Sequence, residues 1–167
     1  MENLWAPWRM AYIAPQAPLP NECIFCAKPA ANRDEENYIL HRSEHCFMML
    51  NLYPYNNGHL MVAPYQHVSS ISYLDAASLA DLMAQVQLAL SALRLAMNPD
   101  GFNMGINEGK VAGAGFAEHM HLHVVPRWNG DTNFMPVIAD VKVMPEHLDN
   151  VYRQLRQAIA TVKSETK

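Results

Sequence analysis

The prediction of the fold starts from the sequence HMHLHVVPRW, at residues 119–128. Three histidines alternate there with apolar residues. On a helix, His119 and His123 would share a face while His121 pointed roughly opposite. On a strand the three histidines share one side, and the apolar residues between them share the other: Met120, Leu122 and Val124. The alternation therefore predicts a strand over 119–125 with an apolar core face and a polar face.

Distance limits what the three histidines can do together. Each two-residue step along a strand advances about 6.6–6.8 Å, so the Cα atoms of His119 and His123 lie roughly 13 Å apart. Zinc–nitrogen bonds are about 2.0–2.1 Å long, so one ion is poorly placed to take all three rings, although two neighbours could share a metal. We therefore expect the histidines to have different tasks. Pro126 has no N–H to donate, so strand pairing is expected to end there.

The flanking sequence predicts an antiparallel sheet with two helices. Further strand-like runs lie between turn signals: 38–42, 46–52, 59–63 and 102–107. Apolar residues at three- and four-residue steps predict a long helix over 74–97, with Asp75 as its N-cap and a stop at 98–101. A second amphipathic helix is predicted over 145–162. Strands interrupted by a helix indicate the α+β class.

Three regions are expected along the chain: an arm at 1–22, a main domain at 23–135 and an extension with the amphipathic helix at 136–167. The arm has four prolines and two tryptophans. We expect it to be ordered against the domain, because solvated tails rarely contain a sequence such as WAPW.

Composition argues against several partners and compartments. The 167 residues carry a formal net charge of −4, which gives no basic surface for a nucleic-acid polymer. No run approaches the roughly 18 apolar residues of a membrane helix, and the start MENLWAPWRM lacks the pattern of a secretory signal. The cysteines, at 23, 26 and 46, are an odd number for a disulfide scaffold. We expect a cytoplasmic protein with no membrane or nucleic-acid partner.

The motif HMHLHVV resembles the signature of the histidine-triad (HIT) family, and CIFC, NLYPYNNGHLMVAPYQH and NEG extend the resemblance over roughly 22–135. The ends LWAPWRMAYI and PRWNGDTNFMPV resemble a bacterial branch close to diadenosine polyphosphate hydrolases and phosphorylases. The resemblance implies an α+β, HIT-like fold: an antiparallel sheet of about five strands, one long central helix and a C-terminal helix. It also implies a homodimer that binds purine nucleotides or dinucleoside polyphosphates and transfers or hydrolyses nucleotidyl groups at the α-phosphorus.

The same resemblance assigns roles to side chains. The middle histidine of the family is the nucleophile, which places that role on His121, and a ring with a pKa near 6.5 is mostly neutral at pH 7. His123 and His59 are expected to meet the charge on the phosphoryl oxygens. The position of Asn51 matches the family residue that binds the ribose hydroxyls. Backbone amides of a glycine-bearing loop are expected to approach the phosphate: Gly113, Ala114 and Gly115.

This chain departs from the family in that loop. Family hydrolases often carry glutamines before the triad. Here Asn107 stands near one such place, and Ala114 or Gly115 stands near the other. We still expect Asn107 to contact the nucleotide, but the loss of a side-chain donor leaves the phosphate contacts and the preferred acceptor open.

The pair Cys23 and Cys26 is half of a possible zinc site, because two thiolates need two further ligands to complete a tetrahedron. Five other residues could supply them: His41, His45, Cys46, His67 and His119. In HIT relatives with CxxC, the partners match His67 and His119. A closed site of this kind would be structural zinc and would leave His121 free.

Other functions stay open at this point. An adenosine 5'-phosphoramidase would use the same mechanism with a smaller leaving group. A purine nucleotide-binding regulatory module would have little activity. A zinc hydrolase would hold one catalytic metal between His119 and His121.

Overall fold

The computed structural model describes residues 22–131 and 146–165 of the chain. Within these described residues there are five strands and three α-helices, with two short 3-10 turns, η2 (Ile71–Tyr73) and η3 (Lys110–Ala112). The helices are α2 (Ile24–Ala30), α3 (Ala76–Met97) and α5 (Leu148–Glu165). The strands are β1 (Ile39–Arg42), β2 (Cys46–Leu50), β3 (Leu60–Pro64), β4 (Gly101–Ile106) and β5 (Leu122–Arg127). The predicted α+β fold, with its antiparallel sheet, long helix and C-terminal helix, is confirmed.

The five strands form one antiparallel sheet in the order β1-β2-β3-β5-β4. The histidine strand β5 therefore lies inside the sheet, between β3 and β4. His123 pairs with Met61 on one side and with Gly105 on the other. The two edges of the sheet are β1 and β4.

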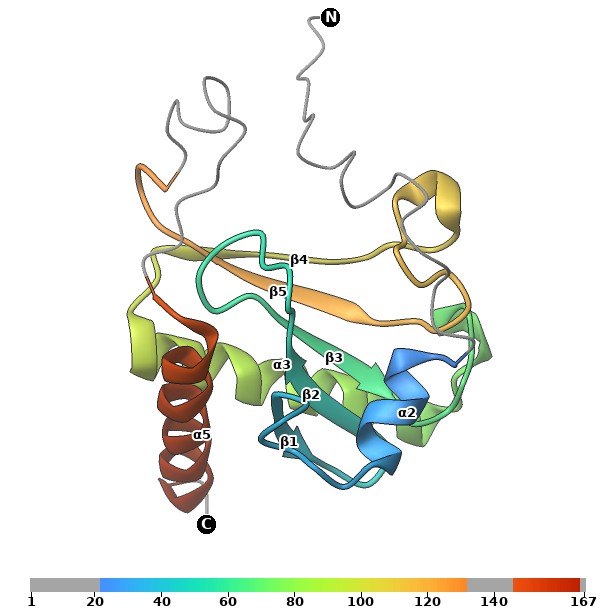
Figure 1. Ribbon diagram of the computed structural model, residues 1–167, viewed down its shortest axis with the longest axis horizontal. Coiled ribbons are helices and arrows are strands. Elements are labelled where there is room, and N and C mark those ends of the chain that lie inside the picture. The colour runs from blue at the N-terminus through green and yellow to red at the C-terminus, as the bar shows by residue number, and fades with distance from the viewer. Residues whose placement is uncertain (1–21, 132–145, 166–167) are drawn as a thin grey trace, which may run out of the picture.

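The two faces of the sheet contribute to separate cores. On one face, side chains of β2, β3 and β5 pack with α3 and α5 in the larger core cluster. On the other face, residues of β1, β2 and β3 form a smaller cluster with Phe25 of α2: Ile39, Phe47, Met49, Met61 and Ala63. Figure 1 shows α3 running along the sheet, with α5 toward one end and α2 toward the other. The short α2 covers only part of its face, and the histidines share that face.

The long helix α3 begins and ends as its sequence predicts. The Asp75 carboxylate accepts a hydrogen bond from the Ser78 N–H at 2.7 Å, and Asn98 ends the helix in the left-handed conformation. Its length and mean hydropathy of 1.3 would also suit a membrane span. Leu82 and Leu93 of this helix are fully buried in the larger cluster.

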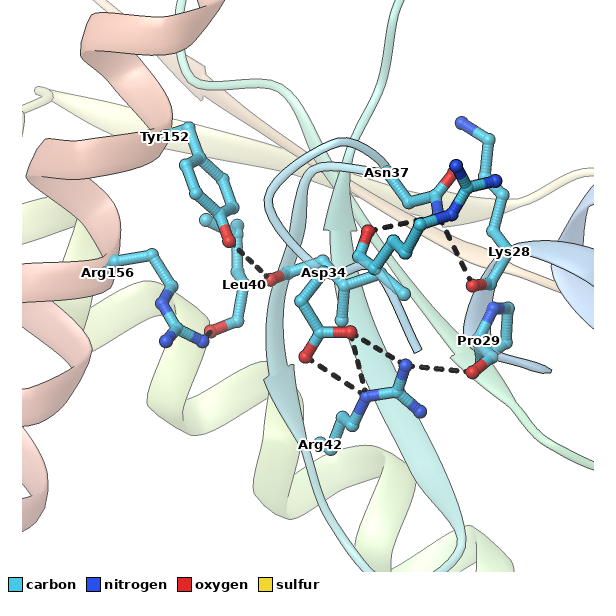
Figure 2. A network of polar contacts seen from close by, with 10 residues as sticks. Lys28, Pro29, Asp34, Asn37, Leu40, Arg42, Tyr152 and Arg156 are labelled. Atoms are coloured by element: carbon cyan, nitrogen blue, oxygen red, sulfur yellow. Dashed lines mark hydrogen bonds and ion pairs between the residues drawn. The ribbon is translucent and has the colours of Figure 1, made fainter. Parts of the chain in front are cut away.

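Side chains of α5 and the 33–38 turn fasten β1 to its surroundings (Figure 2). Tyr152 and Arg156 of α5 donate to the backbone carbonyls of Ile39 and Leu40, which covers this edge of the sheet. The Arg42 guanidinium holds Asp34 through two nitrogens at 2.7–3.1 Å and donates to the Pro29 carbonyl in α2 at 2.9 Å. The helix α2 is thereby joined to β1.

One expectation about β5 is wrong. Pairing does not end at Pro126, because Pro126 pairs with Phe102 and the strand continues to Arg127. Pairing with β3 extends only over Leu122–Val124, so past that point β5 needs hydrogen bonds on one side alone. The Pro126 carbonyl faces the other side, where it accepts from Asn56 at 3.1 Å. The missing N–H of proline therefore costs no ladder hydrogen bond.

Several expectations lie partly outside the described residues. These are the arm at 1–22, except for residue 22, and the stretch 132–145 with the start of the second helix. The division of the chain into three regions stays a prediction. The other predicted elements agree with the structure to within about three residues, which is the usual uncertainty of element ends.

Candidate active site and metal centre

The three histidines of the decisive segment share one face, as predicted. His119 and His121 precede β5, and His123 lies within it. All three are buried, with exposed fractions of 0%, 5% and 9%. The residues between them belong to the larger core cluster on the opposite face: Met120, Leu122 and Val124. The three imidazoles are thus buried, but they belong to neither of the two apolar core clusters.

A Cys/His cluster capable of holding a metal ion lies at the first histidine. The ligand atoms of Cys23, Cys26, His67 and His119 all lie within 4.8 Å of one another. His119 Nδ1 is 3.3 Å from the Cys23 Sγ, 3.6 Å from the Cys26 Sγ and 3.3 Å from the His67 Nδ1. Tetrahedral zinc with sulfur and nitrogen ligands separates its ligand atoms by about 3.3–3.8 Å, so this donor set fits the ion.

The tautomer of His119 suits this role. Its Nε2 lies 2.9 Å from the Pro64 carbonyl, which can only accept, so the ring proton is on Nε2. Nδ1 then points its lone pair at the cluster. The other candidate ligands, His41, His45 and Cys46, are not part of this cluster. Burial raises the pKa of Cys46 to about 12, so its sulfur stays protonated.

His121 is held in the opposite tautomer. Its Nδ1 lies 2.9 Å from the His119 carbonyl and must donate to it, which leaves the lone pair on Nε2. This Nε2 has no hydrogen-bond partner within 22–131 and 146–165. Every fully buried side-chain nitrogen or oxygen there has one, so the Nε2 of His121 is open to solvent. Burial lowers the pKa of His121 below its ordinary value, which favours the neutral ring.

His59 and His123 form a directed hydrogen-bond chain. The Tyr55 backbone N–H donates to His59 Nδ1 at 3.0 Å, so the His59 proton is on Nε2. That Nε2 is 2.9 Å from His123 Nδ1 and donates to it. His123 consequently carries its own proton on Nε2. Burial, and then the charge of His121, lower the pKa of His123 to about 4, so it is neutral at pH 7.

Open space lies next to His123. Its partner Gly105 carries no side chain, and a Cβ built there would meet nothing within 4 Å. Cross-strand partners place their side chains on the same face. The sheet therefore leaves room for a ligand at β4, on the face that carries the histidines.

Asn51 lies beside His59, as expected for one site. The side-chain oxygen of Asn51 accepts from the Tyr53 N–H at 2.9 Å, and its Nδ2 is 3.4 Å from His59 Nδ1. Asn51 is buried, with 6% exposed. The methionines Met49 and Met61, on neighbouring positions, pack in the smaller core cluster.

The glycine-bearing loop uses two of its three predicted amides internally. The Gly113 N–H donates to the Lys110 carbonyl, and the Ala114 N–H to the Gly109 carbonyl. Gly109 and Gly113 have φ of 78° and 86°, which other residues rarely adopt. Gly115 is exposed, and Asn107 at the start of the loop is half-buried.

Three aromatic residues at the site escaped the sequence prediction. Phe25 stacks on His121, and Phe116 of the glycine-bearing loop meets Phe25 edge-on with ring centroids 5.9 Å apart. Tyr55 lies against His59 and His123. Phe25 and Tyr55 stand within motifs that the sequence did display, CIFC and YPYNNG, but nothing local indicated which rings they would touch.

Comparisons with known proteins agree with this geometry. A HIT domain matches residues 32–130. The AP-4-A phosphorylase of Mycobacterium tuberculosis is 43% identical over 168 residues, which covers 96% of this chain and 84% of that protein. A Zn-bound histidine triad family protein from Mycobacterium smegmatis has a TM-score of 0.70 and 28% identity, covering 86% of this chain and 97% of its own. A hypothetical histidine triad nucleotide-binding protein from Sulfolobus tokodaii has a TM-score of 0.68 and 28% identity, covering 84% and 94%.

The buried His123 predicts an acid-sensitive contribution to stability. Its pKa is about 4 in the folded protein and about 6.5 in the unfolded chain. The unfolded chain therefore binds the extra proton between these values, so the contribution is complete above pH 6.5 and is lost as the pH falls to about 4. His123→Asn keeps an acceptor for His59 without the titration. Between pH 7 and pH 4.5, the free energy of unfolding of this variant should fall by about 2 kcal/mol less than that of the wild type, as measured by urea titration.

If the free energy of unfolding of His123→Asn falls with pH as steeply as that of the wild type, the ring of His123 is not held neutral by burial.

Proposed function

The chain belongs to the HIT family, and from this premise we propose that it cleaves dinucleoside polyphosphates at the α-phosphorus through a covalent nucleotidyl intermediate on His121. The observation that carries the proposal is the hydrogen bond between His121 Nδ1 and the His119 carbonyl. It keeps the lone pair of the ring on Nε2, the nitrogen that solvent reaches. A neutral imidazole in this state is a nucleophile without any general base.

The proposed reaction has two displacements. In the first, the lone pair of His121 Nε2 forms a bond to the α-phosphorus, and the bond from phosphorus to the bridging oxygen breaks. The leaving nucleotide takes that electron pair. In the second, an oxygen of inorganic phosphate or water attacks the same phosphorus, and the P–N bond returns its electrons to Nε2. Two moderate barriers replace one high barrier.

Neutral hydrogen-bond donors are expected to meet the charge that develops on the oxygens. His59 fixes His123 with its proton on Nε2, so His123 can donate to a phosphoryl or leaving-group oxygen. The exposed Gly115 amide and the Asn107 side chain could add donors from the loop. Asn51, whose amide both donates and accepts, suits the ribose hydroxyls.

Phosphate is the acceptor that the comparisons favour. The relative at 43% identity is named AP-4-A phosphorylase and is matched over nearly the whole chain. We therefore propose a diadenosine polyphosphate such as diadenosine tetraphosphate as substrate and inorganic phosphate as the second acceptor. The alternatives are the phosphoramidase and the nucleotide-binding module, which would use the same pocket.

We further propose that Cys23, Cys26, His67 and His119 hold a structural zinc ion. All four expected ligands converge, and two thiolates with two imidazoles are the donor set of a closed site. The Zn-bound relative has the same fold. Such an ion would fasten α2 to the segment that leads into β5, and no step of the proposed reaction passes through it.

A homodimer is the proposed assembly. Among the strands that the structure describes, none pairs with the outer side of β4, and Met104 on this strand is 53% exposed. Leu95 of α3 is 56% exposed. An open edge and nearby apolar side chains favour pairing with a second copy.

His121→Gly tests the nucleophile. The variant should lose turnover of diadenosine tetraphosphate by roughly 10³-fold or more while AMP binding, measured by calorimetry, survives. With phosphate present, the wild type should release ADP and ATP, separated by chromatography. His45→Gly, at a partly exposed histidine outside both the triad and the Cys/His cluster, should retain activity. A fully active His121→Gly protein would exclude the mechanism, and AMP in place of ADP would make water the acceptor.

Cys26→Ser tests the zinc site. The wild type should contain about one zinc per chain by mass spectrometry, and the variant much less. Its unfolding temperature should fall by about 5 °C or more. Cys46→Ala, which removes a buried sulfur outside the cluster, should lose stability but keep its zinc. If a chelator stops turnover at once in protein that remains folded, the metal is catalytic.

Met104→Glu tests the dimer. Sedimentation or light scattering should give the mass of two chains for the wild type, and a shift toward one chain for the variant, because β4 edges that meet would bring like charges together. Tyr73→Glu, at another exposed apolar site, is the control. A wild type with the mass of one chain would contradict the proposal.

A further inference from the structure

Phe25 lies where the metal cluster meets the proposed nucleophile. It stands between Cys23 and Cys26 at the start of α2, and its side chain is 1% exposed. Its ring centroid is 4.5 Å from that of His121, with 24° between the two planes. Phe25 also lies 5.3 Å from the ring of His119.

The hydrogen bonds of His121 do not by themselves fix its ring. One bond at Nδ1 sets the tautomer and anchors one edge, but the imidazole can still swing about that anchor. The flat face of Phe25 opposes such a swing, because tilting the ring would break the stacked contact or force the rings together. Direction matters for this side chain, since displacement at phosphorus needs the Nε2 lone pair in line with the leaving oxygen.

We propose that Phe25 is a positioning residue for His121: its stacked ring holds the imidazole plane so that Nε2 faces the α-phosphorus. The proposal rests on the proposed function of His121. It gives the CxxC segment a second task beside metal binding. The two cysteines, on either side of Phe25 in sequence, fix the position of the Phe25 ring. The Phe25 ring in turn fixes the orientation of the His121 imidazole.

Phe116 extends the same arrangement to the glycine-bearing loop. Its ring meets Phe25 at 88°, the edge-to-face geometry that aromatic pairs favour. Phe25 therefore contacts both the nucleophile and the loop proposed to bind the phosphate. A change in its shape should disturb their relative placement.

The chain offers a matched control in Phe47. Phe47 is buried in the same small core cluster as Phe25, with 0% exposed. It also stacks on an aromatic ring, that of Tyr65, at 5.4 Å and 25°. Phe47→Leu thus removes the same atoms from the same core and the same type of contact, without touching His121.

The experiment compares Phe25→Leu with Phe47→Leu in the zinc-loaded protein. Both variants should lose stability to a similar extent. Only Phe25→Leu should slow the formation of nucleotidyl-histidine in single-turnover assays, by roughly 10- to 100-fold with KM little changed. In NMR, the His121 ring should give sharp side-chain signals in the wild type and in Phe47→Leu, but signals broadened by ring motion in Phe25→Leu. Phe25→Tyr, which keeps the flat ring, should recover most of the rate.

Equal rates for the two leucine variants, or His121 signals in Phe25→Leu as sharp as those of the wild type, would overturn the positioning role. That result is distinct from failure of the proposed function. If the wild type forms no nucleotidyl-histidine, or if His121→Gly is active, the function fails first. The NMR comparison still decides whether Phe25 orders the ring.

Discussion

Two backbone carbonyls decide the chemistry of neighbouring histidines. The Pro64 carbonyl accepts a hydrogen bond from the Nε2–H of His119, and the His119 carbonyl accepts one from the Nδ1–H of His121. The first ring therefore offers Nδ1 to the Cys/His cluster, and the second offers Nε2 to the open side of the sheet. Identical side chains two residues apart acquire opposite tautomers because each faces a different acceptor. Everything proposed for this chain, from the metal ligand to the nucleophile, depends on that division.

The short helix α2 gives this arrangement its rigidity. It carries two of the four cluster residues and also the ring that stacks on His121. Seven residues are too few for a helix to be stable alone. Arg42 compensates from β1, since it binds the Pro29 carbonyl near the end of α2 and the Asp34 carboxylate beside it. The side chains proposed to act on phosphorus are thus positioned by contacts that begin at the far edge of the sheet.

Sequence alone predicted what periodicity controls. The alternation around His121 gave the strand and its two faces, and Asp75 gave the start of α3, because local geometry determines both. Contacts between segments that are distant in sequence could not be predicted in this way. His59 and His123 are 64 residues apart, and the hydrogen bond between them follows from sheet register. The positions of His67 and Asn51 were anticipated through the family resemblance, whereas the stacking of Phe25 was not anticipated at all. The expected stop at Pro126 failed because a strand with one remaining neighbour can accept a proline.

Burial gives the site an unusual electrostatic character. Phosphate sites commonly use fixed cations, but here burial lowers the pKa of His121 and brings that of His123 to about 4. Neutral rings attract a polyphosphate less strongly than imidazolium would, so the proposed binding would rely on hydrogen bonds aimed at the phosphoryl oxygens. In return the lone pair of His121 stays available for the proposed attack, and His123 keeps its direction as a donor because a charged His123 could no longer accept from His59. Burial makes each of these bonds stronger than it would be in water. Burial therefore weakens the long-range attraction between the histidines and a polyphosphate. It also preserves the hydrogen-bond chain from His59 to His123, on which the proposed transfer of the nucleotidyl group would depend.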